Sequence, residues 1–465
     1  MSTKRGGVRP RLRVTTALLA AAVSLLGGGA ARAATLEWNT FLGGAGGNEV
    51  AAGIARDAAG NIYVVGVATA GFGIPTRPYT ASSDAFVAKL SPNGTRLWLT
   101  FLGGSGQDFG EAVAVNAAGN VYVAGYSNAT WGAPLVAYSQ STDGFVARLD
   151  ASTGTLVWQT FVGGSGGDRN DAVATLGTAV LVAGSSGATW GTPVRPYSAL
   201  SDAHVMALNA ATGARLWHTF LGGSGDDFGY GLGSEGADSL FIVGDADATW
   251  GMPVRPYTLE VDGFAARLDA DTGALVWSSF LGGSGFDVAR GVAVDGAGQV
   301  YVAGSASASW GNPVTAFATA AMNSFDAFVA RLSGSSGALI WNTFLGSPAS
   351  DLGHGGIATD ALGNVYVAGE SQASWGTPLA AYTASNDGFV ASLTTAGGAR
   401  NWNTFVGGTG VDGAYALTAD AQGNLFATGP STASWGSPIV AYTGFSDAFA
   451  VRLRSDFVFR DGFED

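Results

Sequence analysis

Short apolar runs separated by glycine-rich turns recur along almost the whole chain. One such stretch, residues 98–108, joins an aromatic run to the turn Gly-Gly-Ser-Gly-Gln-Asp. Counterparts of this stretch begin at seven tryptophans, at intervals of 59 to 64 residues: Trp38, Trp98, Trp158, Trp217, Trp277, Trp341 and Trp402. A repeat of nearly fixed period indicates one architecture made of equivalent units rather than several unrelated domains.

The second repeat illustrates the pattern within each unit, which predicts four short antiparallel strands. Residues 111–115 and 121–125 are apolar runs joined by Asn-Ala-Ala-Gly-Asn, a turn with a polar cap and a glycine suited to positive φ. A long loop containing Trp-Gly-Ala-Pro follows, and residues 143–149 and 156–162 form the third and fourth runs. Each repeat is therefore expected to form a four-stranded meander.

The fourth run of each repeat is apolar on both faces. Trp158 and Phe161 lie three positions apart, so in a strand their side chains point to opposite sides of the sheet. A two-sheet sandwich leaves one face of each sheet in water, whereas this pattern requires a neighbouring sheet on both sides. Sheets stacked radially around an axis supply those neighbours.

The two ends of the repeat region complement each other. The region starts on a run of the fourth type, residues 36–43, and finishes on a run of the third type, residues 447–453. Pairing these two runs completes the last unit and closes a ring. We therefore predict an all-β, seven-bladed propeller of four-stranded antiparallel blades over residues 34–454, closed by its N-terminal strand.

Three motifs carry a resemblance to a known family. They are Ala-Val-Ala-Val-x5-Val-Tyr-Val-Ala-Gly, Asp-Gly-Phe-Val-Ala-Arg-Leu and Trp-x-Thr-Phe-Leu-Gly-Gly, at residues 112–125, 143–149 and 98–104. Together they resemble the SBBP repeat of exported bacterial proteins, whose members are seven-bladed β-propellers. The resemblance spans residues 36–453 and implies the fold, but it implies no defined activity.

The segments outside the repeats suggest export. Residues 1–33 have a basic start, an apolar run and a final Ala-Arg-Ala, as in a signal peptide cleaved after Ala33. The tail, residues 455–465, looks like the Phe-x-Asp-Gly-Phe-Glu ending of some exported γ-proteobacterial proteins, which suggests either a sorting signal or a simple polar terminus. We expect a secreted or cell-surface protein, with the periplasm as a further location, and no membrane span after cleavage.

Charge and composition exclude some partners. The sequence has 22 basic and 35 acidic residues and no cysteine. Removing six basic residues with the leader leaves 22 − 6 = 16, so the mature net charge is 16 − 35 = −19. Such a charge disfavours nucleic-acid binding, and the lack of cysteine excludes disulfides and thiolate metal sites. We expect a monomer without a cofactor, with calcium as the one candidate ion.

Two sets of repeated residues emerge on one face of the expected propeller. The turn aspartates lie nearer the axis: Asp108, Asp168, Asp227, Asp287, Asp351 and Asp412, with Asn48 in the seventh place. The loop tryptophans lie further out as candidate ligand-binding residues: Trp131, Trp190, Trp250, Trp310, Trp375 and Trp435, with Phe72 as the seventh. An aromatic rim could stack on sugar rings. The simpler interpretation is that each aspartate caps its turn and each tryptophan packs under its loop.

The fourth repeat departs most from the others. Asp226, Asp227, Asp245 and Asp247 are its candidate metal ligands, and two facing carboxylates there could instead cleave glycosides. A solvated acidic patch is the simpler interpretation. We assign no catalytic residue. The first hypothesis is a non-enzymatic binding module for a glycan or a protein; the alternatives are a carbohydrate-active enzyme using these carboxylates and a purely structural envelope protein.

Overall fold

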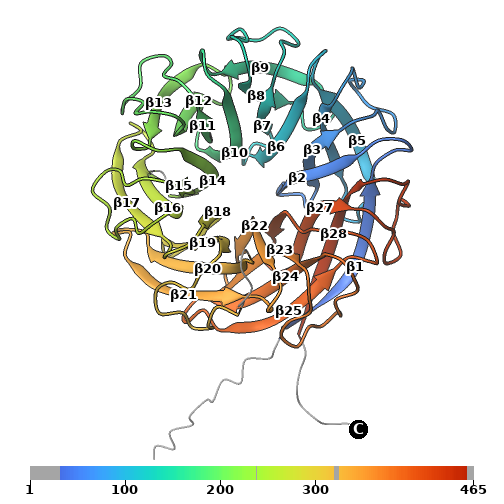
Figure 1. Ribbon diagram of the computed structural model, residues 1–465. Coiled ribbons are helices and arrows are strands. Elements are labelled where there is room, and N and C mark those ends of the chain that lie inside the picture. Colours follow the sequence, from blue (N-terminus) through green and yellow to red (C-terminus); the bar gives the residue numbers. More distant parts are fainter. Residues whose placement is uncertain (1–31, 237, 319–323, 458–465) are drawn as a thin grey trace, which may run out of the picture.

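Seven four-stranded antiparallel sheets, called blades below, stand in a ring around a central opening (Figure 1). The computed structural model describes residues 32–236, 238–318 and 324–457. The predicted all-β seven-bladed propeller is confirmed. Among the described residues, no helix has the length and apolar character needed to cross a bilayer.

Each blade runs from an inner strand beside the axis to an outer strand at the rim. Blade 1 contains β2 (Glu49–Arg56), β3 (Ile62–Ala68), β4 (Asp84–Leu90) and β5 (Arg96–Leu102). Blade 2 contains β6 (Asp108–Val115), β7 (Val121–Ser127), β8 (Asp143–Leu149) and β9 (Leu156–Val162). Blade 3 contains β10 (Asp168–Leu176), β11 (Ala179–Ser186), β12 (Asp202–Asn209) and β13 (Arg215–Leu221). Blade 4 contains β14 (Asp227–Glu235), β15 (Ser239–Ala246), β16 (Asp262–Asp269) and β17 (Leu275–Leu281).

The remaining blades follow the same order. Blade 5 contains β18 (Asp287–Val294), β19 (Gln299–Ala306), β20 (Asp326–Ser333) and β21 (Leu339–Leu345). Blade 6 contains β22 (Asp351–Thr359), β23 (Asn364–Ser371), β24 (Asp387–Thr394) and β25 (Arg400–Val406). Blade 7 contains β26 (Ala416–Ala419), β27 (Leu425–Ser431), β28 (Asp447–Phe457) and β1 (Arg32–Leu42).

Blade 7 is assembled from both ends of the chain. β1 pairs antiparallel with β28, from Arg32 opposite Phe457 to Leu42 opposite Ala448. β1 thus supplies the outer strand that the last repeat lacks, as the sequence predicts. The expected leader and tail fall mostly on residues 1–31 and 458–465, which lie outside the described residues, and both remain predictions.

The hydrophobic core is divided among the seven junctions between blades. One cluster joins Leu181 and Val205 of blade 3 to Ile242 and Phe264 of blade 4, and each of these side chains is fully buried. Equivalent clusters occupy the other six junctions. Each blade therefore buries both of its faces, which explains why the outer strands carry apolar residues at successive positions.

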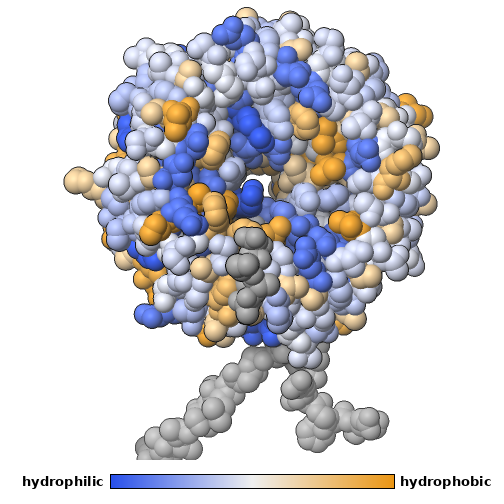
Figure 2. All heavy atoms as spheres, in the orientation of Figure 1, coloured by the Kyte–Doolittle hydropathy of each residue, from blue (hydrophilic) through white to orange (hydrophobic). Residues whose placement is uncertain are grey.

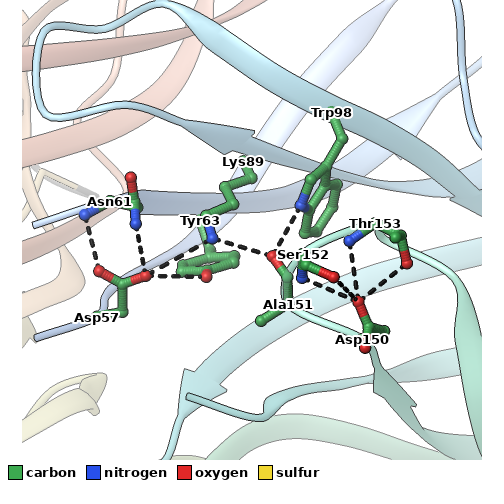
Figure 3. A network of polar contacts seen from close by, with 9 residues as sticks. All are labelled: Asp57, Asn61, Tyr63, Lys89, Trp98, Asp150, Ala151, Ser152 and Thr153. Atoms are coloured by element: carbon green, nitrogen blue, oxygen red, sulfur yellow. Dashed lines mark hydrogen bonds and ion pairs between the residues drawn. The ribbon is translucent and has the colours of Figure 1, made fainter. Parts of the chain in front are cut away.

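Indole side chains fasten neighbouring blades at the outer rim. Trp98, on the outer strand of blade 1, donates from Nε1 to the carbonyl oxygen of Ala151 in blade 2 at 3.0 Å (Figure 3). Lys89 donates to the same oxygen at 2.9 Å, and its Nζ lies 3.7 Å from Asp57 Oδ2. Tyr63 donates to Asp57 Oδ2 at 3.0 Å. Trp98 and Lys89 therefore link the second hairpins of the two blades, and Lys89 also links the two hairpins of blade 1.

A short extended segment after each Trp-Gly-x-Pro loop covers the exposed edge of the outer strand. In blade 2, the N–H of Leu135 donates to Gln159 O at 2.8 Å, and the N–H of Phe161 donates to Val136 O at 3.2 Å. In blade 6, Ala380 O accepts from the N–H of Phe405 at 3.2 Å. Covering the edge in this way satisfies backbone groups that would otherwise invite pairing with another chain.

Candidate binding site in the central channel

The repeated turn carboxylates are buried and bonded to their own turns. Asp227 is fully buried, and its Oδ2 accepts from the N–H of Gly223 at 2.8 Å. The same bond to the second residue of the turn recurs at Asp108, Asp168, Asp287, Asp351 and Asp412, all fully buried. Each carboxylate therefore caps its own turn, the simpler of the two interpretations.

Glu49, and not Asn48, takes the seventh place in this ring. Glu49 is fully buried, and its Oε2 accepts from the N–H of Gly44 at 3.1 Å, whereas Asn48 is exposed. The turn of blade 1 has one extra residue, which shifts the alignment by one position. The longer glutamate side chain spans the added distance. Burial and the nearby Asp447 carboxylate raise the pKa of Glu49 to about 7, against the opposing bond from Gly44.

The loop tryptophans lie under their loops. Trp250 is 4% exposed and packs edge-on against Phe264 and Phe280, at centroid distances of 5.1 and 5.8 Å. The other five are also buried: Trp131, Trp190, Trp310, Trp375 and Trp435. Phe72, the seventh aromatic residue, is buried as well. Rings placed in this way build the blade junctions, which argues against an aromatic rim that stacks on sugars.

The structure separates the four aspartates expected to bind a metal in blade 4. Asp227 caps its buried turn, while Asp247 Oδ1 accepts from the N–H of Asp226 at 2.7 Å at the surface. Asp245 lies elsewhere, hydrogen-bonded to Tyr230. Across the described ranges, no three histidine, cysteine, aspartate or glutamate side chains are grouped to hold a metal ion. Asp227 and Asp245 make separate contacts, the first with the N–H of Gly223 and the second with Tyr230.

A different set of residues gathers around the axis. The inner strands of all seven blades line a cavity of about 420 Å³, and Figure 2 shows hydrophilic residues beside the central opening. One residue per blade stands at the same place in the repeat, and these seven are named the channel ring: Ala52, Glu111, Asp171, Tyr230, Arg290, His354 and Tyr415. They are chemically diverse, unlike the buried positions that recur from blade to blade.

Irregular strand pairing accompanies the channel ring. The register of β6 against β7 shifts between Gly110 and Ala112, which leaves Glu111 unpaired in the ladder. Corresponding shifts occur in blades 1, 3, 4, 5 and 6. Such bulges bend a strand and redirect a side chain, so they explain how this position reaches the cavity.

Arg169 organises one side of the channel. Its Nη2 lies 3.1 Å from Asp171 Oδ1 and 3.8 Å from Glu111 Oε1, and its guanidinium lies 4.2 Å from the centroid of the Tyr126 ring. Tyr126 stacks in turn on Phe109 at 4.7 Å. Burial and repulsion from Asp171 raise the pKa of Glu111 to about 7, although Arg169 opposes the shift.

Arg290 forms the centre of a second group. Its guanidinium lies 5.1 Å from the centroid of the Tyr230 ring, and it attracts the carboxylate of Asp245. Burial raises the pKa of Asp245 to about 7, against the opposing effects of Arg290 and the hydrogen bond with Tyr230. These groups come from blades 4 and 5, so they meet only when the two blades pack together.

His354 forms a third group with residues of blades 6 and 7. Its Nε2 lies 3.4 Å from Glu370 Oε1, and its ring lies 4.3 Å from that of Tyr415. Burial and the carboxylate of Glu370 raise the pKa of Tyr415 to about 12, so its hydroxyl stays protonated. The channel therefore combines aromatic faces with hydrogen-bond donors and acceptors from several blades.

Sequence reasoning missed the channel ring because it searched the positions that every repeat shares. The signal was present at one place in the alignment, three residues after each buried turn carboxylate, where glutamate, aspartate, arginine and histidine replace one another. When the side chain at one position changes its chemical type from repeat to repeat while the neighbouring positions stay constant, that position is a candidate for a role specific to individual blades.

Comparisons with known proteins support the fold. Residues 83–246 match the family model PQQ_2, described as outer membrane protein assembly factor BamB. This is about a third of the chain and supports a β-propeller repeat protein, without identifying the SBBP type. No curated protein matches the sequence.

Solved structures show similar chains at low identity. Quinohemoprotein alcohol dehydrogenase from Comamonas testosteroni is 14% identical over 90% of this chain and 76% of that chain, with a TM-score of 0.46. A europium-containing methanol dehydrogenase is 11% identical over 90% and 93%, with a TM-score of 0.44. A chain of the mitotic checkpoint complex is 9% identical over 92% and 94%, with a TM-score of 0.50. Of these three, only the last is similar enough to bear on this chain, and it supports the fold alone.

The family match contradicts the expectation of no cofactor with calcium as the one candidate ion, because the name PQQ_2 points to propellers of the quinone-cofactor type. The channel residues nevertheless do not fit that cofactor, a planar quinone bearing several carboxylates. Arg169 already pairs with Asp171 and Glu111, and Arg290 is attracted to Asp245. An anionic ligand would find these guanidinium groups engaged with the protein's own carboxylates.

Proposed function

We propose that the protein is an exported, non-enzymatic binding module that takes a small glycan in its central channel. The channel ring is the observation that supports the proposal, because it is where chemically distinct side chains from different blades meet in one cavity. A volume of about 420 Å³ suits a ligand of small-molecule size. A protein surface would not enter such a space, so we favour a glycan over a protein as the channel ligand.

The chemistry of the channel suits a neutral ligand rich in hydroxyl groups. Tyr230 and Tyr415 supply aromatic faces, and Arg290 supplies hydrogen-bond donors. The carboxylates of Glu111 and Asp171 supply acceptors. A sugar hydroxyl both donates and accepts, so it can bond to either kind of group without leaving a buried charge unpaired.

Export and location belong to the same proposal. The leader-like residues 1–33 suggest secretion, and the family model that matches residues 83–246 describes an outer membrane assembly factor. We place the protein outside the cytoplasm, in the bacterial envelope or beyond it, and keep the SBBP repeat type as the finer assignment. A purely structural envelope component would have no need of a polar channel ring.

Titration calorimetry of the full mature chain against glycans selected on a polysaccharide array tests the proposal. Arg290→Gln and Tyr415→Phe remove channel groups, and Arg454→Gln is the control because Arg454 is exposed on β28. We expect at least one channel variant to weaken binding by about tenfold, a loss of roughly 1.4 kcal/mol, and the control to bind normally. Equal binding by all variants, or no glycan bound at all, would contradict a channel site. Release of new reducing ends that Asp245→Asn abolishes would show an enzyme instead.

A further inference from the structure

Arginine covers almost every loop tryptophan. Five of the six have a guanidinium within 6 Å of the ring centroid, as the following pairs show: Arg77 over Trp131 at 5.7 Å, Arg215 over Trp190 at 5.6 Å, Arg195 over Trp250 at 5.8 Å, Arg255 over Trp310 at 5.4 Å, and Arg400 over Trp375 at 5.3 Å. Stacking of this kind protects the ring face and stabilises the charge.

The covering arginine comes from one of two places in the repeat. Arg77 stands on the edge-covering segment of the preceding blade, as do Arg195 and Arg255. Arg215 and Arg400 instead begin the outer strand of the same blade as their tryptophan. Each of the five tryptophans therefore receives one guanidinium, from one side or the other.

Trp435 is the exception among the six. The two equivalent positions hold Ala380 on the preceding blade and Leu36 on its own outer strand. Among the side chains that the structure describes, those of residues 34–236, 238–318 and 324–454, no arginine or lysine lies over its ring. A cavity of about 550 Å³ opens at this junction and is lined by Trp435, Ala380 and Leu36.

In other blades, two backbone carbonyl groups bind the covering arginine, and the corresponding two residues line this cavity. Arg77 donates from Nη1 to Phe101 O at 3.0 Å and from Nη2 to Gly103 O at 2.6 Å. Arg255 repeats this with Phe280 O and Gly282 O at 2.9 and 2.6 Å. The corresponding residues at the cavity are Phe405 and Gly407, and both line it.

The charge beside the cavity also favours a cation. Each blade junction buries two carboxylates, one from the turn and one from the start of the third strand. Burial raises the pKa of Asp84 and of Asp108, and the attraction of Arg77 to this pair of carboxylates opposes the shift. The pair at the cavity is Asp387 and Asp412, both fully buried. Burial raises the pKa of Asp412, and repulsion from Asp387 adds to the shift.

We infer that this cavity is a docking site for an arginine side chain presented by a partner polypeptide. The guanidinium stacks on Trp435 and donates its planar fork to Phe405 O and Gly407 O, in the way that Arg77 does within the chain. Arginine suits the site better than lysine because its planar guanidinium presents a fixed fork of donors to two carbonyls while its flat face stacks on the ring. The negative net charge of the mature chain further favours a basic partner.

Calorimetry with the peptides acetyl-Gly-Arg-Gly-amide and acetyl-Gly-Lys-Gly-amide tests the inference on the full mature chain. We expect saturable binding of the arginine peptide that weakens with salt, and lysine binding weaker by about tenfold or more. Ala380→Arg fills the site from inside and is expected to abolish binding. Thr315→Arg is the matched control, because it changes the equivalent position facing Trp375, which Arg400 already covers.

A second variant keeps the inference testable if Ala380→Arg fails to fold. Leu36→Arg introduces the guanidinium from the outer strand, at the place that Arg215 and Arg400 occupy in their blades, and should also abolish binding without lowering Tm. Binding that persists in both variants, or lysine binding as tight as arginine, would overturn the inference. Self-association that either variant removes would assign the site to a second copy of the chain and overturn the proposal of a partner. Loss of this binding leaves glycan binding in the channel unaffected, so the two sites are tested separately.

Discussion

The guanidinium of Arg452 lies 3.2 Å from the carboxylate of Glu37, although the two residues are 415 positions apart in the sequence. They face each other on β28 and β1, the strands that complete blade 7. The contact shows that the first strand belongs structurally to the last blade, so both ends of the chain stabilise the same sheet.

Ring closure predicts that β1 is as important for stability as any internal outer strand. Phe41 of β1 is 1% exposed and packs on Trp435 at 6.0 Å, and Phe161 of β9 is 3% exposed at the same place in blade 2. We expect Phe41→Ala and Phe161→Ala to lower the free energy of unfolding by similar amounts, about 3–5 kcal/mol. Urea unfolding followed by fluorescence measures both. A negligible cost for Phe41→Ala alone would show that β1 is dispensable.

The loop tryptophans should matter for stability and not for ligand binding in the channel. Trp250→Ala empties a site where the indole packs between Phe264 and Phe280, so we expect a loss of about 3–5 kcal/mol. Met252 in the same loop is 95% exposed, and Met252→Ala should change stability by no more than about 0.5 kcal/mol. Thermal unfolding and glycan titration on the same samples check both parts. Weaker glycan affinity in folded Trp250→Ala would restore the aromatic rim as a binding surface.

Buried carboxylates should make the protein less stable as the pH rises. Burial raises the pKa of Asp227 from 3.8 to about 8 and that of Asp287 from 3.8 to about 7. These groups hold their protons more tightly in the folded state, so folding takes up protons between about pH 4 and pH 8 and the free energy of unfolding falls across that window. We expect a decrease of roughly 1–3 kcal/mol between pH 5 and pH 8.

Urea unfolding at several pH values measures this dependence. Asp227→Asn should flatten the slope because it removes one of the titrating groups. Asp150→Asn is the control: the pKa of the exposed Asp150 is lowered to about 2 by hydrogen bonds from Ser152 and Thr153, so it does not titrate in this range. A free energy of unfolding that rises with pH in the unmodified protein would contradict the assignment.

Arg169 should stabilise the folded protein by neutralising the negative charges of Glu111 and Asp171 in the channel. Removing it leaves Glu111 and Asp171 near each other without a counter-charge. Because the Arg169 side chain is 47% exposed and water screens its charge, we expect Arg169→Ala to cost about 1 kcal/mol near neutral pH. Lowering the pH should recover part of this loss, since Glu111 can then be protonated. Arg454→Ala should stay within about 0.5 kcal/mol, because Arg454 is exposed. Unfolding curves at pH 5 and pH 8 separate the two variants.

The fold could be predicted from the sequence because every blade repeats the same pattern of apolar runs and turn residues. The pattern around Trp158 and Phe161 specified a sheet buried on both faces, and the missing outer strand of the last repeat specified ring closure. Both predictions are confirmed by the sheet order and the blade-junction clusters. Only the alignment of blade 1 failed, because one extra turn residue put Glu49 where Asn48 was expected.

The candidate site was much less readable. Asp227 and Asp245 are near in sequence and lie on paired strands, yet Asp227 turns into the junction while Asp245 bonds to Tyr230. Sequence alone does not show which side of a bulged strand a side chain faces. Nor does it show that Arg169 reaches the carboxylate of Glu111 from a different blade, because that contact depends on how neighbouring blades pack.

The pairing of β1 with β28 also determines when the molecule can finish folding. A chain that is made or exported from its N-terminus leaves β1 without a sheet partner until the final strand emerges, so an unsatisfied edge persists throughout the process. Closing so long a loop comes late and slowly compared with forming the hairpins of a single blade. The ring therefore stays incomplete until β28 is available, and the pairing of β28 with β1 closes it.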